Sequence, residues 1–228
     1  MCRTTAPLAS LIVGSFTLGS LTSSPASTSP SLLGAPTKAA LEALGWLDLV
    51  GVVEIDPGVS ETAASQQTYQ LPPDSLANCV VVGGKREGTE RLAACVVLFT
   101  TRADVNGLVR RRIDVRKASF LSMDEAVMLT GMEYGGINPI GLPTEWPILI
   151  DRQVAETEVV LIGSGVRGSK LLLPGTLLGE LPAHRFHLFL EIGDVFRRLA
   201  GFGRGFTALG GAAKGGEMMV ATIPMMKP

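Results

Sequence analysis

The chain has 228 residues, of which 46% are hydrophobic and 18% are charged, and its formal net charge is −1. This length accommodates one domain with a well-buried core, and the composition excludes an intrinsically disordered protein. The small net charge excludes a general attraction to nucleic acid, so any such contact must come from a local patch.

Cysteine usage predicts the cellular compartment. The chain contains Cys2, Cys79 and Cys95 without a C-x-x-C pair, and the last two lie within apolar runs. A free cysteine in such a run usually behaves as a small core residue. An odd number of cysteines without a zinc or disulfide pattern is typical of a reducing compartment, so we expect a cytoplasmic protein.

The first 35 residues differ in composition from the rest. Arg3 precedes an apolar stretch over residues 6–21, and a run rich in Ser, Thr, Pro and Ala follows. A secretory signal is one interpretation, but it has a single basic residue, and Pro7 and Gly14 interrupt the apolar stretch. We expect residues 1–35 to form a disordered leader. No run of about 18 apolar residues predicts a membrane span, so we expect no membrane partner.

Helices and strands alternate along the next 65 residues. Apolar residues at helical spacing and continuous β-branched runs predict the order helix 36–46, strand 50–55, helix from Ser60 or Glu61 to 69, and strands 77–82 and 92–100. The glycine-rich polar segment 83–88 joins the last two strands, which is typical of a hairpin loop.

Local capping signals organise the following region. Asp104 is a candidate N-cap for a helix through Arg112, and Ser122 with Glu125 matches a capping box for a helix ending at Gly131. The remaining expected elements are strand 117–120, a loop over 132–147, strands 148–150, 159–162 and 171–173, and a helix over 174–181. Strands and helices interleave around a central hairpin, so we expect an α/β (mixed α+β) fold with a mixed sheet flanked by helices.

The last 45 residues have another character. Apolar residues recur at helical spacing from Leu188 to Leu199, and residues 201–228 are glycine-rich and nearly uncharged. We therefore expect one domain over residues 36–183 and an extension over 184–228 with one helix and a disordered tail. His184 and His187 have no nearby third ligand, so we expect no metal.

The segment from Thr130 to Pro143 carries the strongest functional signal. It spells TGMEYGGINPIGLP, with adjacent glycines Gly135 and Gly136 followed by Pro139. Residues without Cβ atoms let the backbone approach a ligand and direct N–H groups at an oxygen, and proline stiffens the loop. An oxyanion site requires such a loop, and an ordinary irregular connection is the alternative.

This loop resembles the T-G-x-x-x-G-G-x-x-P-x-G loop of the YbaK and prolyl-tRNA synthetase editing-domain family. The resemblance extends from about Leu41 to Leu178 and includes Ile148–Asp151 and a later glycine turn over residues 163–168. It implies a mixed, partly closed β-sheet with peripheral helices. It also implies hydrolysis of the ester bond of mischarged aminoacyl-tRNA without metal or cofactor, with tRNA and a synthetase as partners.

The sequence departs from the family pattern at two positions. Asn78 stands where many members carry a pocket lysine, and Lys170 stands where many carry an acid after the glycine turn. One interpretation is that the ammonium group reaches the pocket from Lys170; the other is a different substrate or a non-catalytic binding module. We expect Gly135, Gly136, Asn78 and Lys170 in catalysis, with substrate contacts from Pro139, Asp151, Ser164, Gly165 and Gly168.

Two further patterns have alternative interpretations. Gly163, Gly165 and Gly168 spell the dinucleotide-binding pattern G-x-G-x-x-G after a strand, but Pro174 follows too soon for the long helix that this motif opens. The dense basic cluster is either a solvated helix end or a contact for tRNA phosphates. We expect the second role for Arg110, Arg111, Arg112, Arg116 and Lys117.

Overall fold

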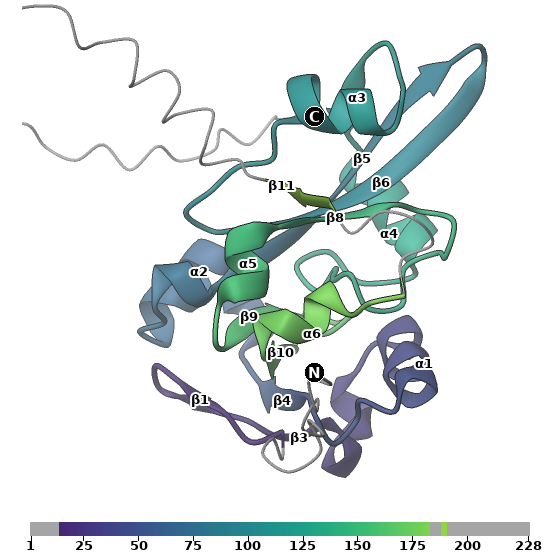
Figure 1. The fold of residues 1–228 in the computed structure, drawn as a ribbon. Coiled ribbons are helices and arrows are strands. Elements are labelled where there is room, and N and C mark those ends of the chain that lie inside the picture. Colours follow the sequence, from purple (N-terminus) through teal and green to yellow (C-terminus); the bar gives the residue numbers. More distant parts are fainter. Residues whose placement is uncertain (1–13, 183–187, 191–228) are drawn as a thin grey trace, which may run out of the picture.

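The computed structural model describes residues 14–182 and 188–190, and Figure 1 shows their arrangement. Five strands form one sheet in the order β11 (Leu188–Leu190), β8 (Ile148–Asp151), β6 (Thr89–Leu98), β5 (Ala77–Arg86), β7 (Ala118–Phe120). Four strands form a second sheet in the order β3 (Ser24–Pro25), β4 (Gly51–Glu54), β10 (Ser169–Leu173), β9 (Val160–Gly163). A β-bridge between Leu76 and Leu161 links the two sheets.

Both parallel and antiparallel pairs occur, which confirms the expected mixed α+β fold. Strand β8 runs parallel to β6, whereas β5 pairs antiparallel with β6 and with β7. The helices are α1 (Ala35–Leu44), α2 (Thr62–Thr68), α3 (Arg110–Arg112), α4 (Met123–Thr130), α5 (Arg152–Glu156) and α6 (Gly175–Gly179). Shorter helical turns include η4 (Pro57–Val59) and the π-helical turn η6 (Val105–Val109).

Local capping signals determine several helix ends as expected. The side chain of Asp104 accepts hydrogen bonds from the Gly107 and Leu108 amides at the start of η6. Ser122 and Glu125 form the predicted capping box of α4, and Gly131 ends that helix with a positive φ of 65°. Glycine adopts this left-handed conformation at little energetic cost, because it has no Cβ atom.

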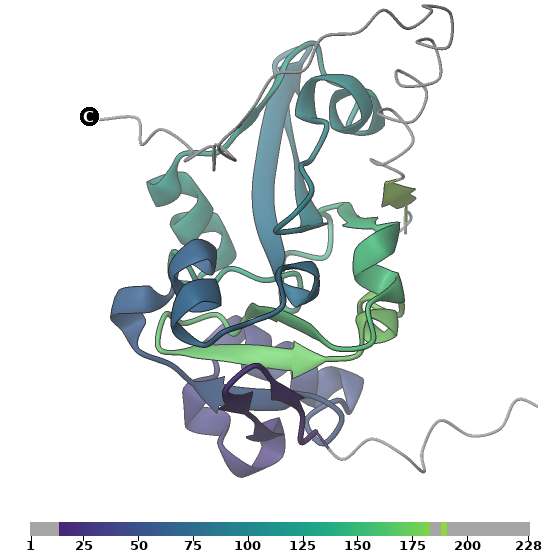
Figure 2. The ribbon, with the colours of Figure 1, turned by 90° about the vertical axis from the view of Figure 1, so that its left-hand side faces the viewer.

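The hairpin β5–β6 is longer than expected, and Figure 2 shows it extending away from the four-stranded sheet. The connection is not the loop predicted over residues 83–88. It is a two-residue turn at Glu87 and Gly88, which both have positive φ as hairpin turns of this length favour. Gly84 lies within β5, where a Cβ atom would be 2.3 Å from the Lys117 carbonyl oxygen of the neighbouring segment.

The core lies between the two sheets. Val52 and Leu171 of the four-stranded sheet pack in one cluster with Val96 and Ile150 of the five-stranded sheet, and Leu178 of α6 belongs to the same cluster. The opposite face of the five-stranded sheet is covered by η6 and the residues after it. Cys95 lies there as a buried free thiol, and burial raises its pKa to about 12.

The expectation of a disordered leader over residues 1–35 is corrected for residues 14–34. Strands β1 (Thr17–Leu18) and β2 (Leu21–Thr22) pair with each other, and β3 joins the edge of the four-stranded sheet. Leu18 and Leu21 are buried in a cluster that contains Leu71 and Leu76. The folded unit therefore begins before residue 36.

The C-terminal expectations are tested only in part. Residues 188–190 form β11, which runs parallel to β8, so the predicted helix does not begin at Leu188. His184, His187 and residues 191–228 lie outside the described residues. Within the described part of the chain, no helix is long and apolar enough to cross a membrane.

Candidate functional site

The two glycine motifs of the sequence pack directly against each other. The Glu133 amide donates to the Gly165 carbonyl oxygen at 3.0 Å, and the Gly165 amide donates to the Gly136 carbonyl oxygen at 2.8 Å. A Cβ atom on Gly163 would lie 2.2 Å from the Gly136 carbonyl oxygen, and one on Gly136 would lie 2.5 Å from the Val166 carbonyl oxygen. These glycines therefore permit the two segments to approach each other.

This packing corrects the expected role of the Gly136 amide. The Gly136 N–H donates to the Glu133 carbonyl oxygen at 2.9 Å within the loop, so it is not available to a substrate oxygen. Gly135 differs from its neighbour. It has a positive φ of 84°, and no described residue accepts a hydrogen bond from its N–H. Of the two predicted backbone donors, Gly135 is therefore the one whose N–H has no acceptor among the described residues.

Lys170 reaches this loop from β10. Its side chain is buried, with the residue 5% exposed, and its Nζ donates to the carbonyl oxygens of Ser60 and Gly135, each at 2.8 Å. Burial lowers its pKa from the ordinary value of 10.5 to about 8, and the charge of Arg167 contributes further. An ammonium group has three N–H donors, and these two carbonyls use two of them. The third has no acceptor among the described residues.

Arg167 is a second cation at the same place, and the sequence did not predict it. Its guanidinium donates to the carbonyl oxygens of Tyr134 at 3.2 Å and Pro57 at 3.3 Å, and its amide donates to the Glu133 carboxylate at 2.7 Å. Lys170 and Arg167 therefore both connect the segment of residues 57–60 to that of residues 134–135.

Asn78 contacts the segment that contains Ser60 through Thr62. The Thr62 hydroxyl donates to the Asn78 side-chain oxygen, while the Ser60 carbonyl oxygen accepts from Lys170. Residues 60–62 thus link Asn78 and Lys170, the two positions at which the sequence departs from the family pattern. The structure brings Asn78, Lys170 and Gly135 together around residues 60–62, and we call this group the lysine site.

Ser60 is the least expected member of the lysine site. It is 1% exposed, and among the described buried side chains its Oγ alone has no hydrogen-bond partner. A buried polar group without a partner costs about 1–3 kcal/mol. The sequence signal was ambiguous, because a serine before a helix is usually an N-cap. Here the N-cap position belongs to Glu61.

The other predicted substrate contacts have structural roles. Ser164 lies buried inside the glycine turn, where its hydroxyl is 2.7 Å from the Ser169 hydroxyl. Asp151 caps α5 through the Gln153 amide and accepts from the Thr101 hydroxyl, and burial raises its pKa. These hydrogen bonds of Asp151 go to residues outside the lysine site. Pro139 is buried and lines an apolar cavity of about 250 Å³ beside α1.

The room for a Cβ atom differs between Gly165 and Gly168. Gly165 has a positive φ of 91°, and a Cβ atom there would lie 2.8 Å from the Thr37 hydroxyl. A Cβ atom on Gly168 would meet only the Pro57 ring, at 3.7 Å. The segment that contains both glycines joins the antiparallel strands β9 and β10. Since no helix begins there, the dinucleotide-binding interpretation is wrong.

This difference in space predicts a difference in stability. Gly136→Ala should lower the free energy of unfolding by about 1–3 kcal/mol, because its Cβ atom would overlap the Val166 backbone. Gly168→Ala, in ordinary van der Waals contact, should change it by less than about 1 kcal/mol. Urea unfolding of both variants measures the difference. Equal destabilisation would contradict the packing described here.

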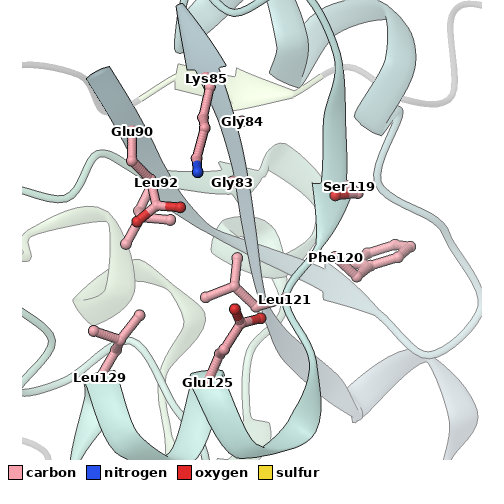
Figure 3. A pocket seen from close by; sticks show the side chains of 10 residues that line it. All are labelled: Gly83, Gly84, Lys85, Glu90, Leu92, Ser119, Phe120, Leu121, Glu125 and Leu129. Atoms are coloured by element: carbon pink, nitrogen blue, oxygen red, sulfur yellow. The ribbon is translucent and has the colours of Figure 1, made fainter. Parts of the chain in front are cut away.

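Lys85 lies far from the lysine site. It follows Asn78 by seven residues along β5, a separation of about 23 Å at the usual rise of a strand. Figure 3 shows its amino group pointing into a separate cavity of about 320 Å³ between the hairpin, β7 and α4, with Glu125 on the opposite wall. Lys85 is exposed, and its charge contributes to lowering the Glu125 pKa after two hydrogen bonds from Ser122.

The predicted basic cluster gathers near the far end of the hairpin. Arg111, Arg112, Arg116 and Lys117 are exposed and Arg110 is half-buried, all on α3 or the segment that leads into β7. Arg86 and Arg91 of the hairpin extend this basic surface, although both form ion pairs with Asp114. The cluster therefore lies beside the end of the hairpin that is farther from Asn78.

Comparisons with known proteins identify this fold. Residues 56–180 match the aminoacyl-tRNA editing domain family, so the chain belongs to that family. A hypothetical protein, APE2540, superposes with a TM-score of 0.57 at 18% identity, covering 68% of this chain and 97% of its own. A candidate trans-editing enzyme for prolyl tRNA synthetase superposes with a TM-score of 0.53 at 23% identity, covering 66% and 90%. These likenesses show the fold alone. No curated protein matches the chain.

Proposed function

We propose that this chain is an aminoacyl-tRNA deacylase that hydrolyses the ester bond of mischarged tRNA in trans. The observation that carries the proposal is the contact between the Lys170 ammonium group and the Gly135 carbonyl oxygen. It places a buried cation against the motif loop of an editing domain, although the position that carries lysine in many members is Asn78 here.

The reaction requires groups that stabilise a negative charge on the ester carbonyl oxygen. As water adds to the carbonyl carbon, that oxygen gains charge, and fixed donors lower the barrier. The Gly135 N–H and the third N–H of Lys170 have no acceptor among the described residues, and we assign them this role. The C–O bond to the ribose then breaks, and the ribose oxygen takes up the proton released by the attacking water.

A protein base is not required by this assignment. The resemblance implies that a ribose hydroxyl of the tRNA helps to orient the water, and such a hydroxyl is both donor and acceptor. Asn78 would contact the amino acid with the amide nitrogen of its side chain, because its oxygen already accepts from Thr62. Asp151 and Ser164 have no part in this mechanism, since their side chains are bound elsewhere.

The tRNA is the proposed macromolecular partner. Arg110, Arg111, Arg112, Arg116 and Lys117 supply a local basic surface on a chain whose net charge is −1. Phosphate contacts of this kind position a nucleic acid without selecting its sequence. A synthetase that releases the mischarged tRNA is the second partner that family membership suggests.

A non-catalytic binding module is the second candidate. It is favoured by the neutral Asn78 and by the two protein carbonyls that already bind Lys170. Hydrolysis separates the two candidates, because a module binds mischarged tRNA but leaves its ester intact. We expect the purified chain to accelerate loss of the amino acid from at least one mischarged tRNA. Binding without acceleration would replace the deacylase by the module.

The pKa of Lys170 predicts how activity depends on pH. Its pKa is lowered to about 8, so the ammonium form prevails at pH 7 and is lost as the pH rises through 8. If this form stabilises the transition state, kcat/KM should fall about tenfold per pH unit above 8 once spontaneous hydrolysis is subtracted. A deacylation profile between pH 6.5 and 9.5 measures this.

The contribution of Lys170 to the free energy of unfolding rises with pH over the range in which the activity falls. The unfolded chain keeps the lysine protonated up to its ordinary pKa of 10.5, while the folded chain releases the proton near 8. The unfolded chain therefore binds more protons between these values, and this residue's contribution to the free energy of unfolding rises with pH. Deprotonation of Lys170 should therefore lower the activity without destabilising the folded chain. A flat or rising profile, corrected for spontaneous hydrolysis, would contradict the assignment.

A further inference from the structure

The Ser60 hydroxyl is an exception among the buried serines of the described chain. Ser23, Ser65, Ser164 and Ser169 are also buried, and all of them have hydroxyl groups with hydrogen-bond partners. The Ser60 Oγ has none. Since native proteins satisfy most buried polar groups, an unsatisfied one at a candidate site indicates a partner that arrives with the ligand.

Its surroundings identify what that partner must be. The Ser60 Oγ lies 2.9 Å from the point where a Cβ atom of Gly135 would be, so it rests directly against that residue. The carbonyl oxygen of Ser60 and that of Gly135 both accept from Lys170, and neither the Ser60 hydroxyl nor the Gly135 amide has an acceptor among the described residues. Two unpartnered donors thus lie side by side next to an ammonium group.

We propose that the Ser60 hydroxyl and the Gly135 N–H together bind the carbonyl oxygen of the aminoacyl ester. The oxyanion that forms as water adds has three lone pairs, so it can accept from both donors and from the third N–H of Lys170. The inference rests on the proposed function and names a residue that the motif does not contain. Ser60 contacts the reacting oxygen, while the cation of Lys170 stabilises the charge that develops on it.

Access to this hydroxyl requires a local movement of the turn that precedes it. Ser60 follows the turn η4, whose Pro57 and Gly58 are exposed, and hydrogen bonds from Arg167 and Lys170 hold that turn near residues 134–135. A substrate oxygen placed against Ser60 and Gly135 gives the Ser60 hydroxyl the acceptor that it lacks in this structure. The unsatisfied hydroxyl therefore favours the liganded protein over the free one.

The test compares Ser60→Ala with Ser23→Ala. Ser23 is a buried serine just before β3 and outside the lysine site, and its hydroxyl accepts from the Phe16 amide at 2.9 Å. Ser60→Ala should lower kcat for deacylation about tenfold or more with KM within about threefold, because the donor acts mainly in the transition state. Its melting temperature should stay level or rise. Ser23→Ala should lower the melting temperature and keep kcat.

A separate measurement distinguishes this inference from the proposed function. The stabilisation of each protein by an aminoacyl-adenosine analogue, in which a tetrahedral phosphonate replaces the ester and mimics the charged transition state, is followed as a shift in melting temperature. The shift should be smaller for Ser60→Ala than for the parent and Ser23→Ala. An active parent with an equally active Ser60→Ala overturns the Ser60 assignment alone. A parent that deacylates no tRNA overturns the proposed function, and an analogue shift unaffected by Ser60→Ala then overturns the inference too.

Discussion

Lys170→Ala is expected to slow deacylation by about tenfold or more, while Lys85→Ala stays within about twofold of the parent. The Lys170 ammonium group contacts the Gly135 carbonyl oxygen directly and has one N–H left for the substrate. A charge-assisted hydrogen bond contributes about 1.5–3 kcal/mol, which corresponds to about 10- to 150-fold in rate if it forms in the transition state.

Lys85 is the matched control for this prediction. It lies on β5, the strand that also carries Asn78, but it is exposed, and its amino group points into a cavity at the hairpin (Figure 3). Reaching the substrate would require it to extend along much of β5, which no side chain can do. Removing it therefore changes surface charge without changing the lysine site.

Lys170→Met separates a chemical effect from a folding defect. Methionine fills much of the space of the lysine stem but donates no hydrogen bond. Lys170→Met and Lys170→Ala therefore both remove the ammonium group, but the alanine variant also leaves a larger cavity. Similar activity losses in both variants support the proposed role, provided that circular dichroism shows both to be folded. Equal losses for Lys170→Ala and Lys85→Ala, or a loss in Lys85→Ala alone, would refute it.

Replacing Arg111, Arg112 and Arg116 together by alanine should weaken tRNA binding strongly at low salt. All three side chains are exposed near the hairpin. Each lost phosphate contact removes about 0.7–0.9 from the slope of log K against log salt, so three lost contacts should lower its magnitude by about 2–3. The kcat at saturating tRNA should remain, because these residues lie away from the lysine site.

The control for the arginine triple variant is Arg152→Ala. Arg152 is an exposed arginine of α5 that pairs with Glu156 at 3.2 Å, on a different part of the surface (Figure 1). Its loss should leave the salt slope unchanged. Binding measured by filter retention or anisotropy between about 50 and 200 mM salt covers the informative range. A triple variant with the slope of the parent would show that the cluster is only a solvated helix end.

Elements with local determinants were predictable from the sequence. The capping box of Ser122 and Glu125, the N-cap of Asp104 and the stop at Gly131 all act within a few residues. Elements stabilised by distant residues were missed. Strands β1 and β2 have two residues each, and the burial of Leu18 and Leu21 against Leu71 and Leu76 keeps them in place. No pattern within 14–34 reveals that contact.

The lysine site was predictable only where the motif names its residues. The motif loop indicated Gly135, and the departure at Lys170 suggested a cation whose Nζ does contact that loop. The contacts of Arg167 go to backbone carbonyl oxygens of Pro57 and Tyr134, which any residue type supplies, so no side-chain pattern could indicate them. Gly136 was misassigned because a glycine that packs against another backbone has the same sequence signature as one that approaches a ligand.

The most direct test of the deacylase proposal is the rate at which the full chain releases amino acids from tRNA. A panel of tRNAs, each charged with its own or with a wrong labelled amino acid, is incubated at pH 7 with and without protein, and the remaining ester is followed over time. We expect at least one mischarged tRNA to lose its amino acid about 100-fold faster than without protein, while the correctly charged form of that tRNA is spared. Rates that match the protein-free rate for every tRNA in the panel would contradict the account.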